Sequence, residues 1–176
     1  MGIKKIICLF SVILLTACSA KEYPTQSYTL TNNYNETYTI EYTEKSGFPE
    51  NCVDFVIYHS EKKIADYGAG DYDGVLKAQP QELLYLLNVN DYELYFMGCE
   101  YGDYILVNGE NDLGFNYDRA EINIESIDYA KETHKEKYFK LAEDLKNSYT
   151  ESELKEKFVK CGYDYTAIMY LYDLAS

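Results

Sequence analysis

Apolar and polar residues alternate along the first half of the chain with the two-residue period of a strand that buries one face. The alternation is clear in residues 36–43 and 52–58, and a shorter run follows in residues 63–67. Residues 52–58 are the most apolar of these runs, so we expect that strand to lie in the centre of a sheet. The three runs predict consecutive strands.

Further strand patterns occupy the middle of the chain. Residues 92–99 and 103–108 flank a Glu-Tyr-Gly turn, in which Gly102 is the residue expected for a hairpin. Residues 115–124 also alternate and form another strand candidate. These segments extend the predicted sheet.

The apolar run that follows Pro80 has a different pattern. Residues 83–87 are apolar at almost every position, and Pro80 stands where a helix would begin. We therefore expect a short helix over residues 80–88 that covers the sheet.

From residue 126 the apolar period changes to three or four residues, which is typical of helices. The spacing predicts a helix of about five turns over residues 126–145. Thr150 and Glu153 form a capping box for a second helix, which ends at Gly162. A short third helix is expected over residues 164–174, capped by its first residue.

The order of the elements, strands first and helices last, determines the expected fold class. It favours an α+β fold with an antiparallel sheet of about five to seven strands. A short covering helix and a C-terminal group of two or three helices complete it. We expect a single domain over residues 36–176, a length sufficient for one hydrophobic core.

The first residues combine a short basic segment, an apolar core and a site of small residues. Lys4 and Lys5 precede the apolar run 6–15, and Leu15-Thr16-Ala17-Cys18 follows. The run is too short to span a bilayer. The segment resembles a bacterial lipoprotein signal with its lipobox. That resemblance implies cleavage before Cys18, so that residues 1–17 are the signal peptide, and lipidation of the Cys18 sulfur.

The residues after the lipobox bear on location. Ser19, not aspartate, follows the lipid cysteine. In lipoproteins of two-membrane bacteria this implies an outer-membrane anchor facing the periplasm, whereas a host with one membrane would carry the domain on its surface. Residues 18–35 are polar, so we expect a lipidated N-terminus and a flexible tether there.

The charge balance is strongly acidic. The 176 residues include 16 basic and 30 acidic side chains, a formal net charge of −14. Removal of the signal peptide, with its two lysines, leaves 14 basic residues and a balance of −16. Such a surface repels nucleic-acid phosphates and attracts basic proteins or metal cations. The alternative is that the acidity serves only solubility.

Three cysteines lie outside the signal and its lipobox: Cys52, Cys99 and Cys161. An exported compartment permits disulfides. Cys52 begins one strand pattern and Cys99 ends another, and strand ends of one sheet can approach within bridging distance. We therefore expect a Cys52–Cys99 disulfide, with three buried free thiols as the alternative.

The chain also has 21 tyrosines and no tryptophan. Most should be half-buried sheet residues, since tyrosine favours strands. The alternative is a tyrosine-rich binding face, because tyrosine is enriched at interfaces.

Two acidic loops resemble calcium loops only in part. Asp71 and Asp73 alternate ahead of a glycine, as Ca²⁺ ligands do, but Ala69 and Pro80 occupy the first and last ligand positions of the helix-loop-helix pattern. The acidic stretch 110–112 invites the same interpretation. We expect ordinary acidic turns and no metal.

Catalytic motifs are absent from the sequence. His59 and His134 are the two histidines, and neither stands in a nucleophile–base motif. His134 belongs to the inner stripe of the long predicted helix, and His59 ends a strand beside a turn. A pair of carboxylates for glycoside hydrolysis remains an alternative, because acidic residues are numerous. We expect no catalytic residues and no cofactor.

These patterns favour a membrane-anchored, periplasm-facing lipoprotein that acts by binding a basic protein. A concrete version is an immunity or inhibitor protein that neutralises a cationic enzyme attacking the cell wall. The alternatives are an envelope assembly or maintenance lipoprotein that docks to a larger complex, and a carboxylate-based envelope hydrolase.

Overall fold

A computed structural model describes residues 21–47, 51–70, 78–89, 92–100, 102–107 and 135–175. These residues form strands first and helices last. The elements are β1 (Lys21–Glu22), β2 (Gln26–Thr31), β3 (Thr37–Ser46), β4 (Cys52–His59), β5 (Lys62–Gly70), β6 (Glu82–Val89), β7 (Tyr92–Cys99), β8 (Gly102–Val107), α4 (Lys135–Ser148), α5 (Glu151–Cys161) and α6 (Thr166–Asp173). The α+β class with antiparallel strand pairing is confirmed.

The strands belong to two sheets rather than to the one sheet that we expected. Sheet A contains β1 to β5: β3 pairs with β4 along one side, and β1 and β2 follow each other along its other side. Strand β5 completes sheet A beyond β4. Sheet B is the antiparallel meander β6-β7-β8. The described part of the chain therefore exceeds the expected five to seven strands.

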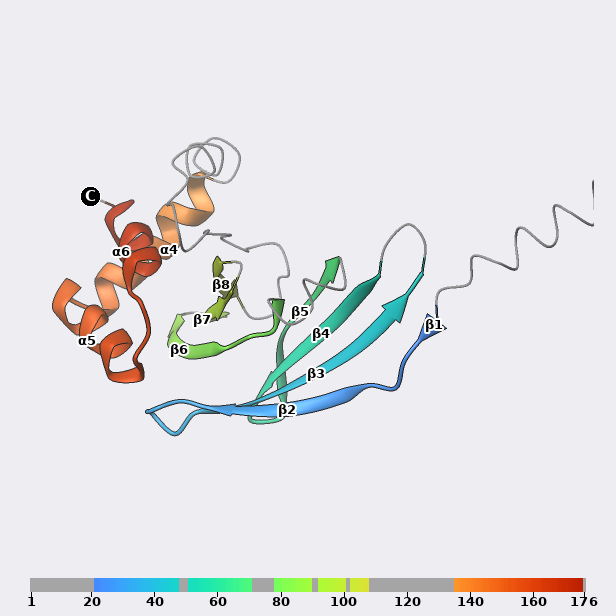
Figure 1. Cartoon of the computed structure of the whole chain (residues 1–176). Coiled ribbons are helices and arrows are strands. Elements are labelled where there is room, and N and C mark those ends of the chain that lie inside the picture. Colours follow the sequence, from blue (N-terminus) through green and yellow to red (C-terminus); the bar gives the residue numbers. More distant parts are fainter. Residues whose placement is uncertain are drawn as a thin grey trace, which may run out of the picture.

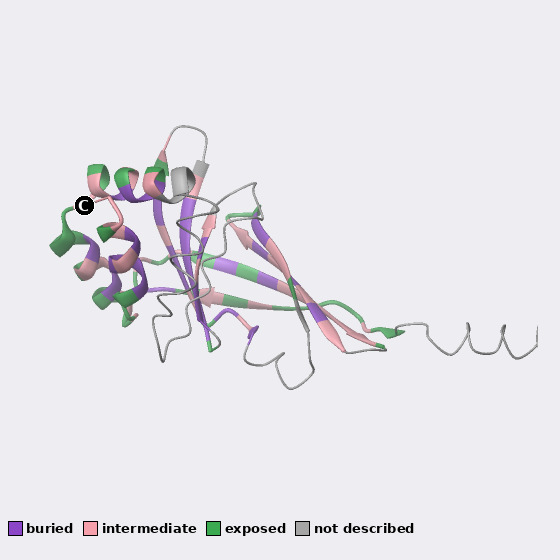
Figure 2. Ribbon diagram, turned by 90° about the horizontal axis from the view of Figure 1, so that it is seen from above, coloured by how far each residue is buried: buried purple, intermediate pink, exposed green. Residues whose placement is uncertain are grey.

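The molecule has three layers, in which sheet B lies between sheet A and the C-terminal helices (Figure 1). Alternate residues of β7 enter different cores. Tyr95 and Met97 pack with sheet A, whereas Leu94 and Phe96 pack with the helices. The buried residues of β6 and β7 therefore lie on both faces of sheet B. Figure 2 shows in purple the buried residues of the strands and helices.

The helix expected over residues 80–88 is wrong, because strand β6 occupies this segment. A strand that is buried on both faces is apolar at nearly every position, as a short buried helix is. The register of β6 with β7 also shifts between Tyr85 and Leu87, so that Leu86 and Leu87 both reach the helical core. Periodicity could not separate the two structures here.

The folded part begins earlier than residue 36. Residues 26–31, which we expected within the flexible tether, form β2 and pair with residues 37–42 of β3. Only Tyr28 and Leu30 of this strand pack against the core between the sheets. An edge strand with two apolar positions has a weak sequence signal, which explains the difference.

The predicted helix boundaries are confirmed for α5. The Thr150 side chain accepts a hydrogen bond from the Glu153 backbone while the Glu153 side chain accepts from Thr150, and Gly162 ends the helix with φ 76°. Asp164 Oδ1 accepts a hydrogen bond from the Thr166 backbone at the start of α6. The described part of the long helix is α4. The strand candidate 115–124 lies outside the described residues.

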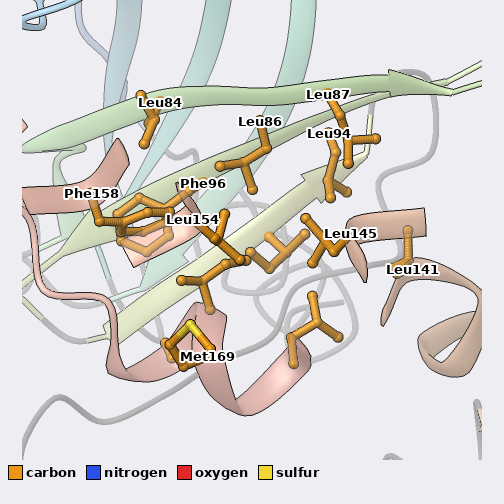
Figure 3. Close-up of a cluster of buried hydrophobic side chains, with 14 of the residues drawn as sticks. Leu84, Leu86, Leu87, Leu94, Phe96, Leu141, Leu145, Leu154, Phe158 and Met169 are labelled. Carbon is orange, nitrogen blue, oxygen red and sulfur yellow. The ribbon is translucent and has the colours of Figure 1, made fainter. Parts of the chain in front are cut away.

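The helical core is formed by leucines of sheet B facing the inner stripes of α4, α5 and α6 (Figure 3). Phe158 of α5 contacts Phe96 of β7 edge to face, with 4.8 Å between ring centroids. Both side chains are almost fully buried. This aromatic contact joins the helices to the middle layer.

Candidate functional site

One end of the two-sheet core carries a group of aromatic and charged side chains that we call the His59 cluster. It brings together strands of both sheets. Its members are Glu36 before β3, Tyr38 on β3, His59 at the end of β4, Lys62 at the start of β5, Tyr85 on β6, and Glu93 and Tyr95 on β7.

The turn between β4 and β5 positions two members of this cluster. Ser60 and Glu61 both have positive φ, 50° and 66°. Positive φ at both central residues is the geometry that lets a two-residue hairpin follow the strand twist. It pairs His59 with Lys62 across the hairpin and leaves both at the cluster.

Aromatic contacts surround the His59 ring. It stacks on Tyr38 with 4.8 Å between centroids and meets Tyr95 edge to face at 5.5 Å. Tyr85 contacts Tyr95 at 5.3 Å and lies 6.2 Å from His59. Tyr38 and Tyr95 are buried, whereas His59 and Tyr85 are half-buried and form the outer part of the cluster.

A chain of hydrogen bonds links His59 to Lys62. His59 Nδ1 lies 3.0 Å from the Tyr95 hydroxyl, which donates to Glu93 Oε2 at 3.1 Å. Lys62 Nζ donates to the same carboxylate oxygen at 3.0 Å. Because the single hydroxyl proton of Tyr95 goes to Glu93, this arrangement assigns a proton to His59 Nδ1, which then donates to Tyr95.

Burial and the charges of the cluster together shift the pKa values of Tyr95 and Glu93. Burial, together with the nearby Glu93 carboxylate, raises the pKa of Tyr95 above its usual range. Burial alone would raise the pKa of Glu93, but hydrogen bonds from Lys62 and Tyr95, with the Lys62 charge, lower it below its usual value. At neutral pH Glu93 is therefore ionised and the Tyr95 hydroxyl beside it stays protonated.

Glu36 is the second carboxylate of the cluster and ties it to β6. Its Oε2 accepts hydrogen bonds from the Tyr38 hydroxyl at 2.8 Å, the Tyr85 backbone at 3.0 Å and Asn32 Nδ2 at 2.6 Å. Asn32 Nδ2 also donates to the Leu83 carbonyl at 3.0 Å. These bonds fix the tip of the β2–β3 hairpin against sheet B.

A second, basic group lies where the hairpin tip meets α5. Lys157 and Lys160 lie over the Tyr34 ring, 4.7 Å and 3.8 Å from its centroid, and Lys157 is 6.0 Å from that of Tyr149. Burial lowers the pKa of Lys157. The Tyr149 hydroxyl donates to the Leu86 carbonyl of β6, so this group also contacts sheet B.

The expected Cys52–Cys99 disulfide is not formed, and both residues, like Cys161, are free thiols. Strand parity explains this. Cys99 has the parity of Tyr95 and Met97, faces the core between the sheets and donates to the Ala78 carbonyl. Cys52 has the opposite parity to the buried Val53, so its side chain belongs to the outer face of sheet A.

Several other residues singled out in the sequence lie outside the described residues: Cys18, Asp71, Asp73, residues 110–112 and His134. Among the described residues, no group of three or more histidine, cysteine or acidic side chains is arranged to hold a metal ion. Within the same ranges no helix is long and apolar enough to cross a membrane.

Sequence reasoning identified His59 as a turn residue but missed its neighbours. Tyr95 and Glu93 are more than thirty positions from His59 along the chain, and Glu36 lies in the connection between β2 and β3. No local motif joins these residues, because the contact arises only when sheet B covers sheet A. Comparisons with protein-family models, curated proteins and solved structures found no match for this chain.

Proposed function

We propose that this protein is a lipid-anchored binding protein of the bacterial cell envelope and that its partner is a basic protein. The observation that carries the proposal is the formal charge of −14, which becomes −16 once a signal peptide ending before Cys18 is removed. A surface of this charge accelerates encounters with cationic partners and disfavours acidic ones. In its concrete form the partner is a cationic enzyme that attacks the cell wall, held inactive by this chain.

The His59 cluster supplies a contact point for such a partner. Tyr85 is half-buried, and the carboxylates of Glu93 and Glu36 both act on its hydroxyl, raising its pKa after the larger contribution of burial. A lysine or arginine over this ring would meet an aromatic face beside the carboxylates of Glu36 and Glu93, the second of which is also paired with Lys62. Because the rings are held by hydrogen bonds and stacking, little side-chain entropy is lost when they are covered.

The anchor is tested by Cys18→Ala. We expect complete loss of fatty-acid incorporation, because the sulfur that forms the lipid thioether is removed. Metabolic labelling with a fatty acid, followed by detergent phase partition, measures this. Cys52→Ala is the matched control, and it should keep the label. Undiminished labelling of the Cys18 variant would contradict the lipoprotein assignment.

The partner is tested by capture with the full chain in detergent. Envelope proteins from the same bacterium are separated by isoelectric point and passed over the immobilised protein. We expect one basic protein to be retained, with an association rate that falls at least tenfold between about 0.05 and 0.5 M salt, because screening removes electrostatic steering. Retention of only neutral or acidic proteins, or of none, would contradict the proposal.

The contact point is tested on the captured protein with Tyr85→Ala. Loss of an aromatic anchor at an interface weakens binding by about tenfold or more. Tyr58→Ala is the matched control, because Tyr58 is also half-buried near a carboxylate but lies on the outer face of sheet A, where its hydroxyl donates to Glu41. Equal affinities of the two variants would place the binding surface elsewhere.

A further inference from the structure

Strand β2 is an outer edge of sheet A, and one of its two rows of backbone groups faces away from β3. The backbone N–H of Asn32 donates to the backbone carbonyl of Glu36, so the backbone groups of Asn32 point toward β3. Backbone groups alternate in direction along an antiparallel strand. Ser27, Thr29 and Thr31 therefore direct their N–H and C=O groups away from β3, and within the described ranges no other strand pairs with β2. Figure 1 shows β2 along the border of sheet A, with β3 as its neighbour.

This edge lacks the features by which proteins discourage strand pairing. Residues 26–31, Gln-Ser-Tyr-Thr-Leu-Thr, contain no charged residue and no proline. The opposite edge strand of the same sheet, β5, carries Lys62, Lys63 and Asp66. Charges on an edge strand hinder the approach of another strand. Within sheet A, β2 is therefore the edge that permits pairing.

The sequence of β2 is complementary to itself in one antiparallel register. With Thr29 opposite Thr29, Ser27 faces Thr31 on the polar outer face of the sheet, and Tyr28 faces Leu30 on its apolar inner face. Hydroxyl pairs and aromatic–aliphatic pairs are both favourable cross-strand neighbours. In this register the residues whose backbone groups point away from β3 form hydrogen-bonded pairs across the twofold axis: Ser27 with Thr31, and Thr29 with Thr29 of the other copy.

We propose that two copies of this chain pair through β2, antiparallel and centred on Thr29, to form one continuous sheet across a twofold axis. A second copy fits better than an unrelated strand, because β2 paired with itself already places polar residues opposite polar ones and apolar residues opposite apolar ones. The pairing also brings no charged side chain of β2 against another, although each chain is strongly acidic overall. This inference is independent of the proposed partner.

Disulfide trapping of the full chain in its native membranes tests the proposal. In the proposed dimer the two Thr29 Cα atoms are about 5.5 Å apart, within the range that a disulfide spans. Under mild oxidation, Thr29→Cys should move most of the protein to dimer size on a non-reducing gel. The matched control is Thr39→Cys, because Thr39 faces Thr29 across the β2–β3 ladder but lies one strand from the edge.

A heterologous pair tests the register separately. Ser27→Cys and Thr31→Cys are made in differently tagged chains. We expect a mixed dimer carrying both tags when the two are co-expressed, and background trapping when either is expressed alone. The wild type, which has free thiols at Cys52, Cys99 and Cys161 among its described residues, gives that background. Thermal unfolding midpoints within a few degrees of wild type show that each variant is folded.

The proposal would be overturned if Thr29→Cys gave no more cross-linked dimer than Thr39→Cys and the tagged pair gave no mixed dimer. Trapping of Thr29→Cys to a different protein would also overturn it and would indicate strand addition by a partner. Mixed dimers alone would support the pairing even if Thr29→Cys failed to fold.

Discussion

Replacing Phe158 with alanine is expected to lower the free energy of unfolding by about 3–5 kcal/mol. The Phe158 ring is fully buried and contacts Phe96, and the core there is formed by three helices and the middle sheet. Figure 3 shows the Phe158 and Phe96 rings side by side at the centre of this core. Truncation leaves a cavity that neither the sheet nor the helices can close fully.

The next residue supplies the control for this prediction. Val159 is 60% exposed on the other side of the same helix turn. Val159→Ala should change stability by no more than about 0.5 kcal/mol, since surface substitutions away from special features have small effects. Denaturant unfolding of both variants, followed by circular dichroism, measures the difference. A loss below about 1 kcal/mol for Phe158→Ala would contradict the packing of α5 on sheet B.

Local patterns predicted the elements that bury one face. Residues 52–58 and the hairpin around Gly102 were found by alternation, and α5 by its capping box and its terminal glycine. Each of these signals acts over a few residues and is therefore visible in a linear sequence. Burial on both faces removes such a signal, and for this reason β6 was mistaken for a helix.

The polar cluster could not be predicted for a different reason. Its members come from turns and strands that are far apart in the sequence, and each looks ordinary in its own segment. His59 is a strand-end residue and Glu93 one of thirty acidic residues. Only the packing of sheet B against sheet A brings them within hydrogen-bonding distance. Clusters that are formed by long-range contacts can be recognised only when the arrangement of the strands is known.

The second large effect is expected for Asn32→Asp, which changes one amide nitrogen to oxygen. Asn32 is only 8% exposed, and its side chain makes four hydrogen bonds. Its Nδ2 donates to Glu36 Oε2 and to the Leu83 carbonyl, and its Oδ1 accepts from the Tyr34 and Glu36 backbones. The substitution removes both donors and places a second carboxylate against Glu36. We expect a loss of about 3 kcal/mol, because a buried charge is left without its partner.

Asn33→Asp is the matched control, since the neighbouring Asn33 donates to the Lys160 carbonyl at an exposed position. Its cost should stay below about 1 kcal/mol. The two variants differ in whether the new carboxyl is buried beside Glu36. Equal losses would contradict the assignment of Asn32 as the residue that fixes the hairpin tip to β6.

The pH dependence of the Asn32 variant gives a sharper test than its stability at one pH. Burial and the Glu36 charge raise the pKa of the introduced carboxyl in the folded state above its unfolded value of about 3.9. The folded state then binds a proton more tightly than the unfolded state. Stability relative to wild type is therefore recovered below the unfolded pKa and lost as pH rises through the folded pKa. The deficit should narrow between pH 7 and pH 4, and a deficit independent of pH would show that lost packing, not charge, is the cause.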